Sequence, residues 1–213
     1  MQVFPVTGLL ATGGSAPSAA LHYTGLAMAS DHEVEIKFQI DDMDGLTRRL
    51  TEAGFRQITP RTHELNTLYD RRAQLRRRGA LLRLRQYGQQ WTLTYKDKSK
   101  ATPGRHKSRR EIETQLENGE AAARIFEALG FSPSFSYEKY RSEWTDGHGH
   151  VVLDETPIGN YGEIEGPPNW IDATAERLEI AHDHYITLSY AELFLAWKRK
   201  SRSKAKHMLF AEI

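Results

Sequence analysis

The 213-residue sequence contains no cysteine. This absence excludes disulfide bonds and thiolate metal sites, and it is typical of a reducing compartment, so we expect a cytoplasmic protein. The sequence also lacks an excess of one charge, because 29 Lys and Arg residues balance 28 Asp and Glu residues. Proteins that bind nucleic acids or anionic membranes generally carry a clear basic excess, so we predict neither as a partner.

Residues 1–30 contain no Asp, Glu, Lys or Arg and no long hydrophobic run. Small residues fill the stretch from Thr12 to Ala20, so we predict a disordered leader over residues 1–30 rather than a secretory signal or a membrane span. Met28 lies just before the first patterned segment, which gives the hypothesis that translation starts there and not at Met1. The intact mass of the natively expressed protein would decide between the two starts.

The other end of the chain is basic, with six Lys or Arg residues between Lys198 and Lys206. Such a run is typical of a solvated helix end, and we predict a C-terminal tail over residues 201–213. The length between the two ends suits one large domain, which we place at residues 31–200.

Seven short stretches of the chain alternate charged and apolar residues with a period of two. On a β-strand, alternate side chains point to opposite faces, so each stretch would have one charged face and one apolar face. Glu33 to Phe38 is the clearest example. The charged positions are, for the basic residues, Lys37, Arg83, Arg85, Lys96, Arg109, Lys139 and Arg141, and, for the acidic residues, Glu33, Glu35, Glu111, Glu113, Asp154, Glu163 and Glu165.

Helical segments separate these strands. Asp42 or Asp44 can cap a helix that ends at Gly54. Asn118 can cap a second helix that ends at Gly130. The other predicted elements are one or two strands within residues 56–72, a turn at 76–79, a hairpin turn at 88–90, a loop at 97–107, strands at 135–144, 150–155 and 161–165, a helix at 170–178, and a last helix that begins with a capping box of Ser189 and Glu192.

Many antiparallel strands with amphipathic helices predict an α+β fold, in which a closed eight-stranded antiparallel β-barrel has helices packed on its outside. The charged strand faces then line the interior. Burying that many charges without water would cost several kcal/mol per ion, so the interior must be wet and filled with ions. Its natural occupant is a polyphosphate held by Lys and Arg groups, together with Mg²⁺ or Mn²⁺ held by the carboxylates.

The same residues resemble the CYTH-type triphosphate tunnel metalloenzymes, the group that contains class IV adenylyl cyclases and thiamine triphosphatases. The likeness runs from about residue 31 to residue 200 in the order of the family motifs. These motifs are ExExK at Glu33, Glu35 and Lys37, LRxR at Arg83 and Arg85, a strand-end lysine at Lys96, RxExE at Arg109, Glu111 and Glu113, KxR at Lys139 and Arg141, and the closing Asp154 with ExE at Glu163 and Glu165.

The resemblance implies a role for each charged group. All seven acidic positions become expected ligands of Mg²⁺ or Mn²⁺, and all seven basic positions become expected phosphate-binding residues. Glu35 and Lys37 are expected to be catalytic, with Lys37 orienting the attacking water or stabilising charge on the terminal phosphate. Glu111 could instead orient an arginine. Arg110 is expected to face outward, and His148 and His150 are expected to lie in a solvated turn.

The resemblance implies an enzyme that processes a small-molecule triphosphate. We expect a metal-dependent triphosphatase acting on tripolyphosphate, thiamine triphosphate or ATP inside the barrel. The alternative is a class IV adenylyl cyclase that converts ATP to cyclic AMP and pyrophosphate, because both reactions use the same anion and metal groups. A non-catalytic module that binds polyphosphate or nucleotide is the third possibility. The pattern does not indicate an oligomeric state.

Overall fold

The computed structural model describes residues 32–98 and 107–213, without the side chains of residues 32, 33 and 107–109. The predicted leader and most of the predicted loop at residues 97–107 therefore lie outside the described residues, and so do the side chains of Glu33 and Arg109. Among the described residues, no helix is long and apolar enough to cross a bilayer.

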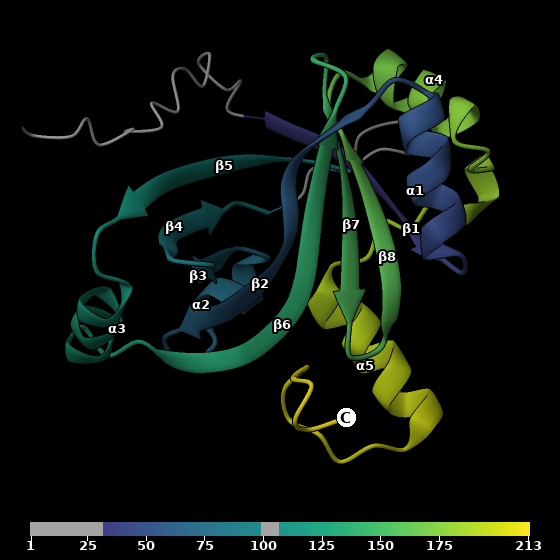
Figure 1. Cartoon of the computed structure of the whole chain (residues 1–213). Helices are drawn as coiled ribbons and strands as arrows, with labels where there is room; N and C mark the ends of the chain where they lie inside the picture. Colours follow the sequence, from purple (N-terminus) through teal and green to yellow (C-terminus); the bar gives the residue numbers. More distant parts are fainter. Residues whose placement is uncertain (1–31, 99–106) are drawn as a thin grey trace, which may run out of the picture.

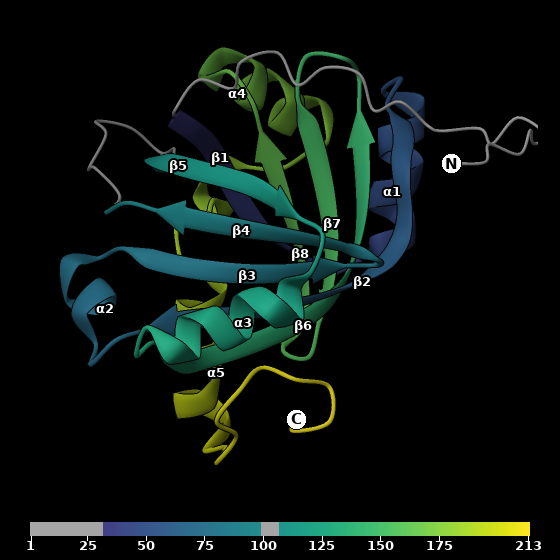
Figure 2. The same ribbon diagram turned by 90° about the vertical axis from the view of Figure 1, so that its left-hand side faces the viewer.

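Eight antiparallel strands form one closed ring, which can be followed in Figure 1 and Figure 2. The order around the ring is β1-β5-β4-β3-β2-β6-β7-β8, and pairing of β1 with β8 closes it. The predicted barrel is confirmed. The strands are β1 (His32–Ile40), β2 (Arg56–Asp70), β3 (Leu81–Tyr87), β4 (Gln90–Lys96), β5 (Lys107–Leu116), β6 (Ser132–Thr145), β7 (His150–Thr156) and β8 (Gly159–Glu165).

Helices lie on the outside of the ring (Figure 1). Their caps follow the sequence, because the side chain of Asp42 caps the first long helix, that of Asn118 caps the second, and Ser189 forms the predicted capping box with Glu192. The helical elements are α1 (Met43–Glu52), α2 (Gln74–Arg78), α3 (Gly119–Ala128), α4 (Pro168–Arg177), a 3₁₀ turn (His182–His184) and α5 (Tyr190–Ser201).

The turn predicted at residues 76–79 was wrong, since most of it belongs to the short helix α2. Gly79 ends this helix with a φ of 72°, a left-handed conformation that glycine adopts without strain. The three consecutive arginines before it are good helix formers, whereas the sequence pattern around them has no apolar period that would signal a helix.

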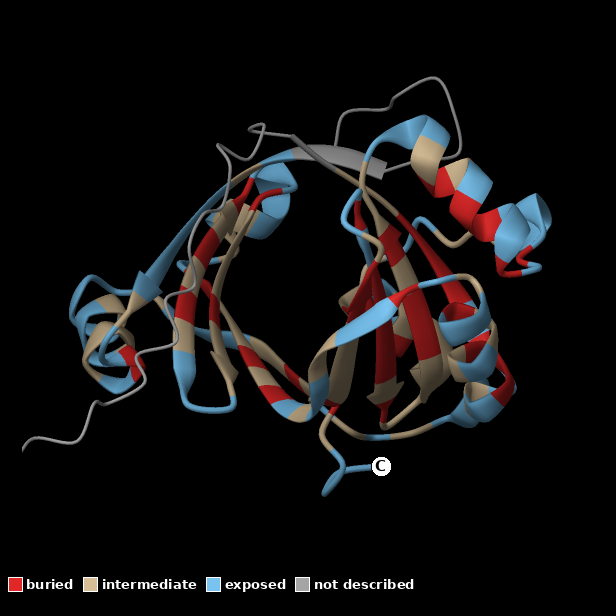
Figure 3. Cartoon of the chain, turned by 45° about the horizontal axis from the view of Figure 1, so that its top comes forward, coloured by how far each residue is buried: buried red, intermediate tan, exposed pale blue. Residues whose placement is uncertain are grey.

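The larger hydrophobic core lies between the barrel wall and helices α1 and α4. The apolar side chains of the alternating strands point outward, with Ile36 and Phe38 on β1 and Ile164 on β8. They pack against Leu50 of α1 and Ile171 of α4, all of them buried. Each such side chain contributes roughly 1.5–3 kcal/mol by leaving water. Figure 3 shows the buried residues on these strands and on the facing sides of the outer helices.

A second apolar cluster lies where α5 and the C-terminal residues meet the barrel. It contains Tyr137 of β6, Tyr161 of β8, Tyr190 and Phe194 of α5, and Met208. Met208 is fully buried although it lies in the segment predicted as a tail. The C-terminal segment therefore packs against the barrel next to α5 through Met208, with Ala205 partly buried beside it.

Backbone hydrogen bonds attach the flanks of α5 to two strands of the barrel. On β1, Lys37 exchanges hydrogen bonds with Ile186, at 3.2 and 2.6 Å between nitrogen and oxygen. On β6, the Met208 nitrogen donates to the Ser136 oxygen and the Glu138 nitrogen donates to the Met208 oxygen, both at 3.0 Å. The two connections fix α5 on both sides, so its first turn has a defined position relative to the barrel interior.

Candidate active site

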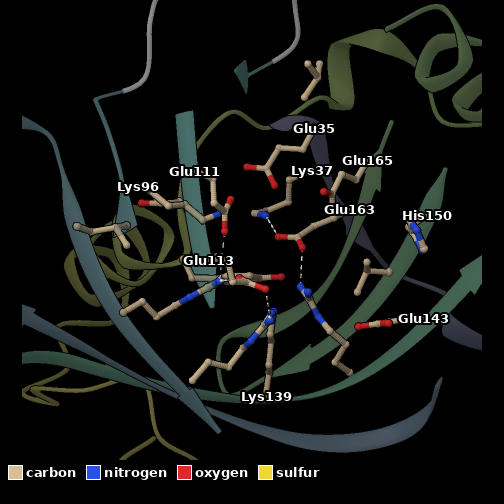
Figure 4. Close-up of a pocket in the computed structure, with 18 of the residues that line it drawn as sticks. Glu35, Lys37, Lys96, Glu111, Glu113, Lys139, Glu143, His150, Glu163 and Glu165 are labelled. Carbon is tan, nitrogen blue, oxygen red and sulfur yellow. Dashed lines mark hydrogen bonds and ion pairs between the residues drawn. The ribbon is translucent and has the colours of Figure 1, made fainter. Parts of the chain in front are cut away.

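The charged faces of the strands enclose a cavity of about 1060 Å³ (Figure 4). Most of the predicted site residues line it. These are Glu35, Lys37, Arg83, Arg85, Lys96, Glu111, Glu113, Lys139, Arg141, Glu163 and Glu165. The backbone register places Glu33 opposite Arg109 on the neighbouring strands β1 and β5. Asp154 is fully buried and is not among the described residues that line the cavity.

One wall of the cavity is built by β1, β6, β7 and β8. Arg141 donates from Nε to Asp154 Oδ1 at 2.7 Å and from Nη2 to Glu163 Oε2 at 2.5 Å. Lys139 Nζ donates to Asp154 Oδ2 at 2.8 Å, and Lys37 Nζ donates to Glu163 Oε1. The two carboxylates therefore hold three cations at fixed positions in this wall.

The burial of this wall changes how its groups titrate. Burial alone would lower the pKa of Lys37, but the attraction of Glu163 and Glu35 outweighs burial and raises this pKa. Burial alone would raise the pKa of Glu163, but Lys37 and Arg141 hold it well below its usual range. Both groups are therefore charged at neutral pH, and the wall offers charged donors to an anion.

The opposite wall is built by β3, β4 and β5. Lys96 Nζ lies 2.5 Å from Glu111 Oε2, and Arg85 Nη2 donates to Glu113 Oε1 at 3.4 Å. Arg83 Nη2 lies 3.8 Å from Glu111 and 3.7 Å from Glu113. The arginine contacts are loose ion pairs rather than short hydrogen bonds, so an anionic ligand can compete for these guanidinium groups.

The carboxylates that line the cavity fit a hard divalent ion by their donor chemistry. Glu35 and Glu165 are register partners on β1 and β8, and Figure 4 shows both near Glu163 on the same side of the cavity. Among the described residues, no three His, Asp or Glu side chains are close enough together to hold a metal ion by themselves. This side of the cavity therefore has suitable oxygen donors without a closed coordination cage.

Tyr190 is a site residue that the sequence analysis missed. Its hydroxyl donates to Asp154 Oδ2 at 2.5 Å, and its ring lies 4.5 Å from Lys37 Nζ and 4.7 Å from Lys139 Nζ. Burial and the charge of Asp154 raise the pKa of Tyr190 well above its usual range, which keeps the hydroxyl protonated as a donor. The capping box predicts where α5 begins, whereas no local signal shows that Tyr190 in its first turn faces the cavity.

Glu64 of β2 was also missed. It is fully buried and lies opposite Lys139 on the neighbouring strand β6. The alternation Glu64-Leu65-Asn66 follows the same period of two as the recognised motifs, and this signal could have identified an inward-facing carboxylate.

His150 and Arg110 complete the inventory of predicted positions. His150 is the first residue of β7, as the strand predicted at residues 150–155 implies, so it does not lie in the solvated turn expected for the two histidines; its side chain is exposed and lines the cavity. His148 remains exposed before the strand. Arg110 is exposed and is not among the described residues that line the cavity.

Comparison with known proteins gives relatives along most of the chain. A curated protein named "Putative adenylate cyclase", from Methanocaldococcus jannaschii, is 28% identical over 176 residues, which are 76% of this chain and 97% of the relative. A solved structure of a "putative adenylate cyclase" from Vibrio parahaemolyticus has a TM-score of 0.67 at 20% identity, covering 76% of this chain and 97% of that chain.

A second solved structure is that of a "putative adenylyl cyclase" from Hippeastrum, for which a dominant triphosphatase activity is described. It has a TM-score of 0.56 at 19% identity, and the match covers 77% of this chain and 95% of that chain. Both structures share the fold. Residues 31–192 match the family model of the CYTH domain. The charged cavity and this match, which spans most of the sequence, lead to one conclusion: the chain belongs to the CYTH family.

Proposed function

We propose that the protein is a metal-dependent triphosphatase that hydrolyses an inorganic or organic triphosphate inside the barrel. The observation that carries this proposal is the cavity itself, in which Lys and Arg side chains from opposite walls and several carboxylates line one space. Such an arrangement suits a chain of phosphates, since every phosphate can meet a cation on either side.

The phosphate chain would lie between the two walls. Arg83, Arg85 and Lys96 would bind it from β3 and β4, and Lys37, Lys139 and Arg141 would bind it from β1 and β6. Arg109 would add a cation from β5, as its register opposite Glu33 suggests. The guanidinium groups offer paired donors to phosphate oxygens, and the ammonium groups act as compact charges.

Carboxylates would hold Mg²⁺ or Mn²⁺ at the side of the cavity where Glu35 and Glu165 meet. Glu33, Glu111, Glu113 and Glu163 would complete the ligand set, while Asp154 is bound by Lys139, Arg141 and Tyr190. When bound, the divalent ion would neutralise charge on the phosphate oxygens. We therefore assign Asp154 to holding the cations of the wall rather than to the metal, although the family resemblance had implied a ligand.

Two residues would take part in hydrolysis most directly. Lys37 stays protonated and lines the cavity, so its ammonium would stabilise charge that develops on the terminal phosphate. Glu35 lines the same space two residues earlier on β1 and would accept a hydrogen bond from the attacking water. Positioning and charge neutralisation supply most of what phosphoryl transfer needs.

The second candidate is a class IV adenylyl cyclase. The cavity volume of about 1060 Å³ is in the range that holds a drug-sized organic ligand, so a nucleoside attached to the phosphates would fit. The relative from Methanocaldococcus jannaschii also bears the name of a cyclase. In this reaction the ribose 3′-hydroxyl of ATP attacks the α-phosphate and pyrophosphate leaves.

Product analysis separates the candidates. The full chain is incubated with ATP, tripolyphosphate or thiamine triphosphate in Mg²⁺ or in Mn²⁺, and orthophosphate is resolved from cyclic AMP and pyrophosphate. We expect orthophosphate from at least one substrate and no cyclic AMP. Cyclic AMP with an equal amount of pyrophosphate would identify a cyclase. If the protein bound tripolyphosphate but turned over none of the substrates, it would be a binding module and the proposal of an enzyme would be wrong.

A further inference from the structure

Glu64 stands out because its carboxylate is fully buried and only one of its two oxygens accepts a hydrogen bond from the part of the chain that the structure describes. The side chain is 0% exposed. Its Oε1 accepts a hydrogen bond from Asn66 Nδ2 at 2.8 Å and lies 3.4 Å from Lys139 Nζ. Its Oε2 has no hydrogen-bond partner among the described residues and lies 3.9 Å from Arg141 Nε. A buried carboxylate oxygen without a hydrogen bond is unfavourable and calls for an explanation.

The charges around Glu64 are those of the phosphate-binding residues. Burial would raise its pKa, but Lys139, Arg141, Arg85 and Arg83 together hold it far below its usual range. All four cations line the cavity, whereas Glu64 is not among the described residues that line it. The carboxylate is therefore a fully buried, ionised group next to the cations, and it does not itself line the ligand space.

Asp154, in the same wall, is a carboxylate whose two oxygens both accept short hydrogen bonds, unlike those of Glu64. It accepts hydrogen bonds at 2.5 to 2.8 Å from Tyr190, Lys139 and Arg141. Lys139 therefore already has one close counter-ion, and Arg141 has two, because Glu163 also accepts a hydrogen bond from it at 2.5 Å. Glu64 adds a further negative charge to the same two cations at longer distances, so it contributes charge more than geometry.

We propose that Glu64 is a positioning residue that acts as a resident counter-anion: it partly neutralises Lys139 and Arg141 and thereby weakens their hold on a phosphate chain. This inference rests on the proposed function, because it assumes that polyphosphate binds at these cations. A carboxylate about 4 Å from the donors repels a phosphate at the same donors, and this repulsion is strong where water is scarce. The benefit to an enzyme is release of the anionic product.

The experiment measures binding rather than turnover. Inorganic tripolyphosphate is titrated by calorimetry into the full metal-free chain in a chelating buffer. Glu64→Gln keeps the size of the side chain and removes its charge, and we expect its dissociation constant to be about tenfold lower than that of the wild type. Glu155→Gln is the matched control, since it removes the same charge from an exposed pair with Arg61 and should bind like the wild type.

A second variant and a second measurement distinguish a change in binding from a loss of folding. Glu64→Asp keeps the charge but withdraws it by one methylene, so its affinity should fall between those of the wild type and Glu64→Gln. In the free protein, Glu64→Gln should lower the melting temperature, because the buried cations lose a counter-ion. Lower stability combined with tighter binding is the expected pair of results.

A purely structural role for Glu64 predicts a different pattern. If both Glu64 variants bound tripolyphosphate as the wild type does, or more weakly, the inference would be overturned while the proposed function stood. If the wild type itself bound no tripolyphosphate, with or without a divalent ion, the proposed function and this inference would fail together.

Discussion

At the scale of single residues, the site shows how a charge can be buried and still face a cavity. Lys37 is 3% exposed, yet Glu163 and Glu35 keep it protonated. Removing one partner of a buried ion pair leaves an uncompensated charge and is usually strongly destabilising, by about 3–5 kcal/mol. Variants at this site therefore need a measurement of folding beside the measurement of activity.

Glu35→Gln and Arg85→Ala are the first substitutions to make. Each removes a group that lines the cavity, and we expect each to lower turnover at least about 100-fold, because positioned charges supply most of the catalysis of phosphoryl transfer. Circular dichroism should show an intact fold in both variants, and the melting temperature is measured beside it, because Glu35 attracts the buried Lys37 and Arg85 attracts the buried Glu64. Arg110→Ala, at an exposed position away from the cavity, is the control and should keep its turnover. Full activity in both site variants would show that the assignment is wrong.

Tyr190→Phe tests whether α5 helps to hold the site. The change deletes the hydroxyl that donates to Asp154 at 2.5 Å and leaves the ring in place. A hydrogen bond to a charged group contributes about 1.5–3 kcal/mol, so urea unfolding should show a loss of that size. Tyr185→Phe is the comparison, because that hydroxyl lies 3.5 Å from Asp172 and should contribute far less. Equal losses in the two variants would contradict the assigned role of Tyr190.

Glu64 also predicts how stability depends on pH. Because its pKa in the folded protein is lowered below the ordinary glutamate value of about 4.3, its contribution to stability is present above that value and is lost as the pH falls further. Melting temperatures of the wild type should therefore fall more steeply below pH 4.3 than those of Glu64→Gln. The gap between the two proteins should be largest at neutral pH. A constant gap from pH 7 to pH 3.5 would exclude an ionised Glu64.

At the scale of elements, the sequence predicted those pieces whose signals are local. Helix caps at Asp42, Asn118 and Ser189 mark three helix starts correctly, because a cap is a contact within three residues of the chain. The bridges of Ile186 and Met208 to the barrel were not predictable. A single residue that pairs with a distant strand leaves no periodic pattern of apolar residues in the sequence. The basic residues around Met208 also suggested a solvated tail.

Met208→Ala measures what the C-terminal segment contributes. Met208 is fully buried against the aromatic residues that join α5 to the barrel. Truncating a buried methionine to alanine costs about 2–5 kcal/mol through lost contacts and the remaining cavity. The midpoint of denaturant unfolding should fall accordingly. Phe210→Ala, at a side chain that is 40% exposed, should cost clearly less. A change below about 0.5 kcal/mol at Met208 would mean that the segment does not stabilise the fold.

At the scale of the whole molecule, the fold inverts the common arrangement of a barrel, with its core outside and its charges inside. The period of two, with charges on one face and apolar residues on the other, was enough to predict this. The pairing of particular charges was not predictable, because it depends on the stagger of strands around the ring. Lys139 meets Glu64 only because β6 pairs with β2 in one register, and a shift by one residue would exchange the two faces.

A cavity filled with opposed charges should respond as a unit to a polyanion. Tripolyphosphate at about 100 times its dissociation constant adds about 2.7 kcal/mol of stability, which for a chain of this size raises the melting temperature by roughly 5–11 °C. Added salt screens charges that remain accessible to solvent, so the shift should shrink as sodium chloride rises from 50 to about 500 mM. Arg85→Ala should reduce the shift at every salt concentration, since it removes a cation that lines the cavity. If the rise in melting temperature changed neither with salt nor with this substitution, tripolyphosphate would bind elsewhere on the protein.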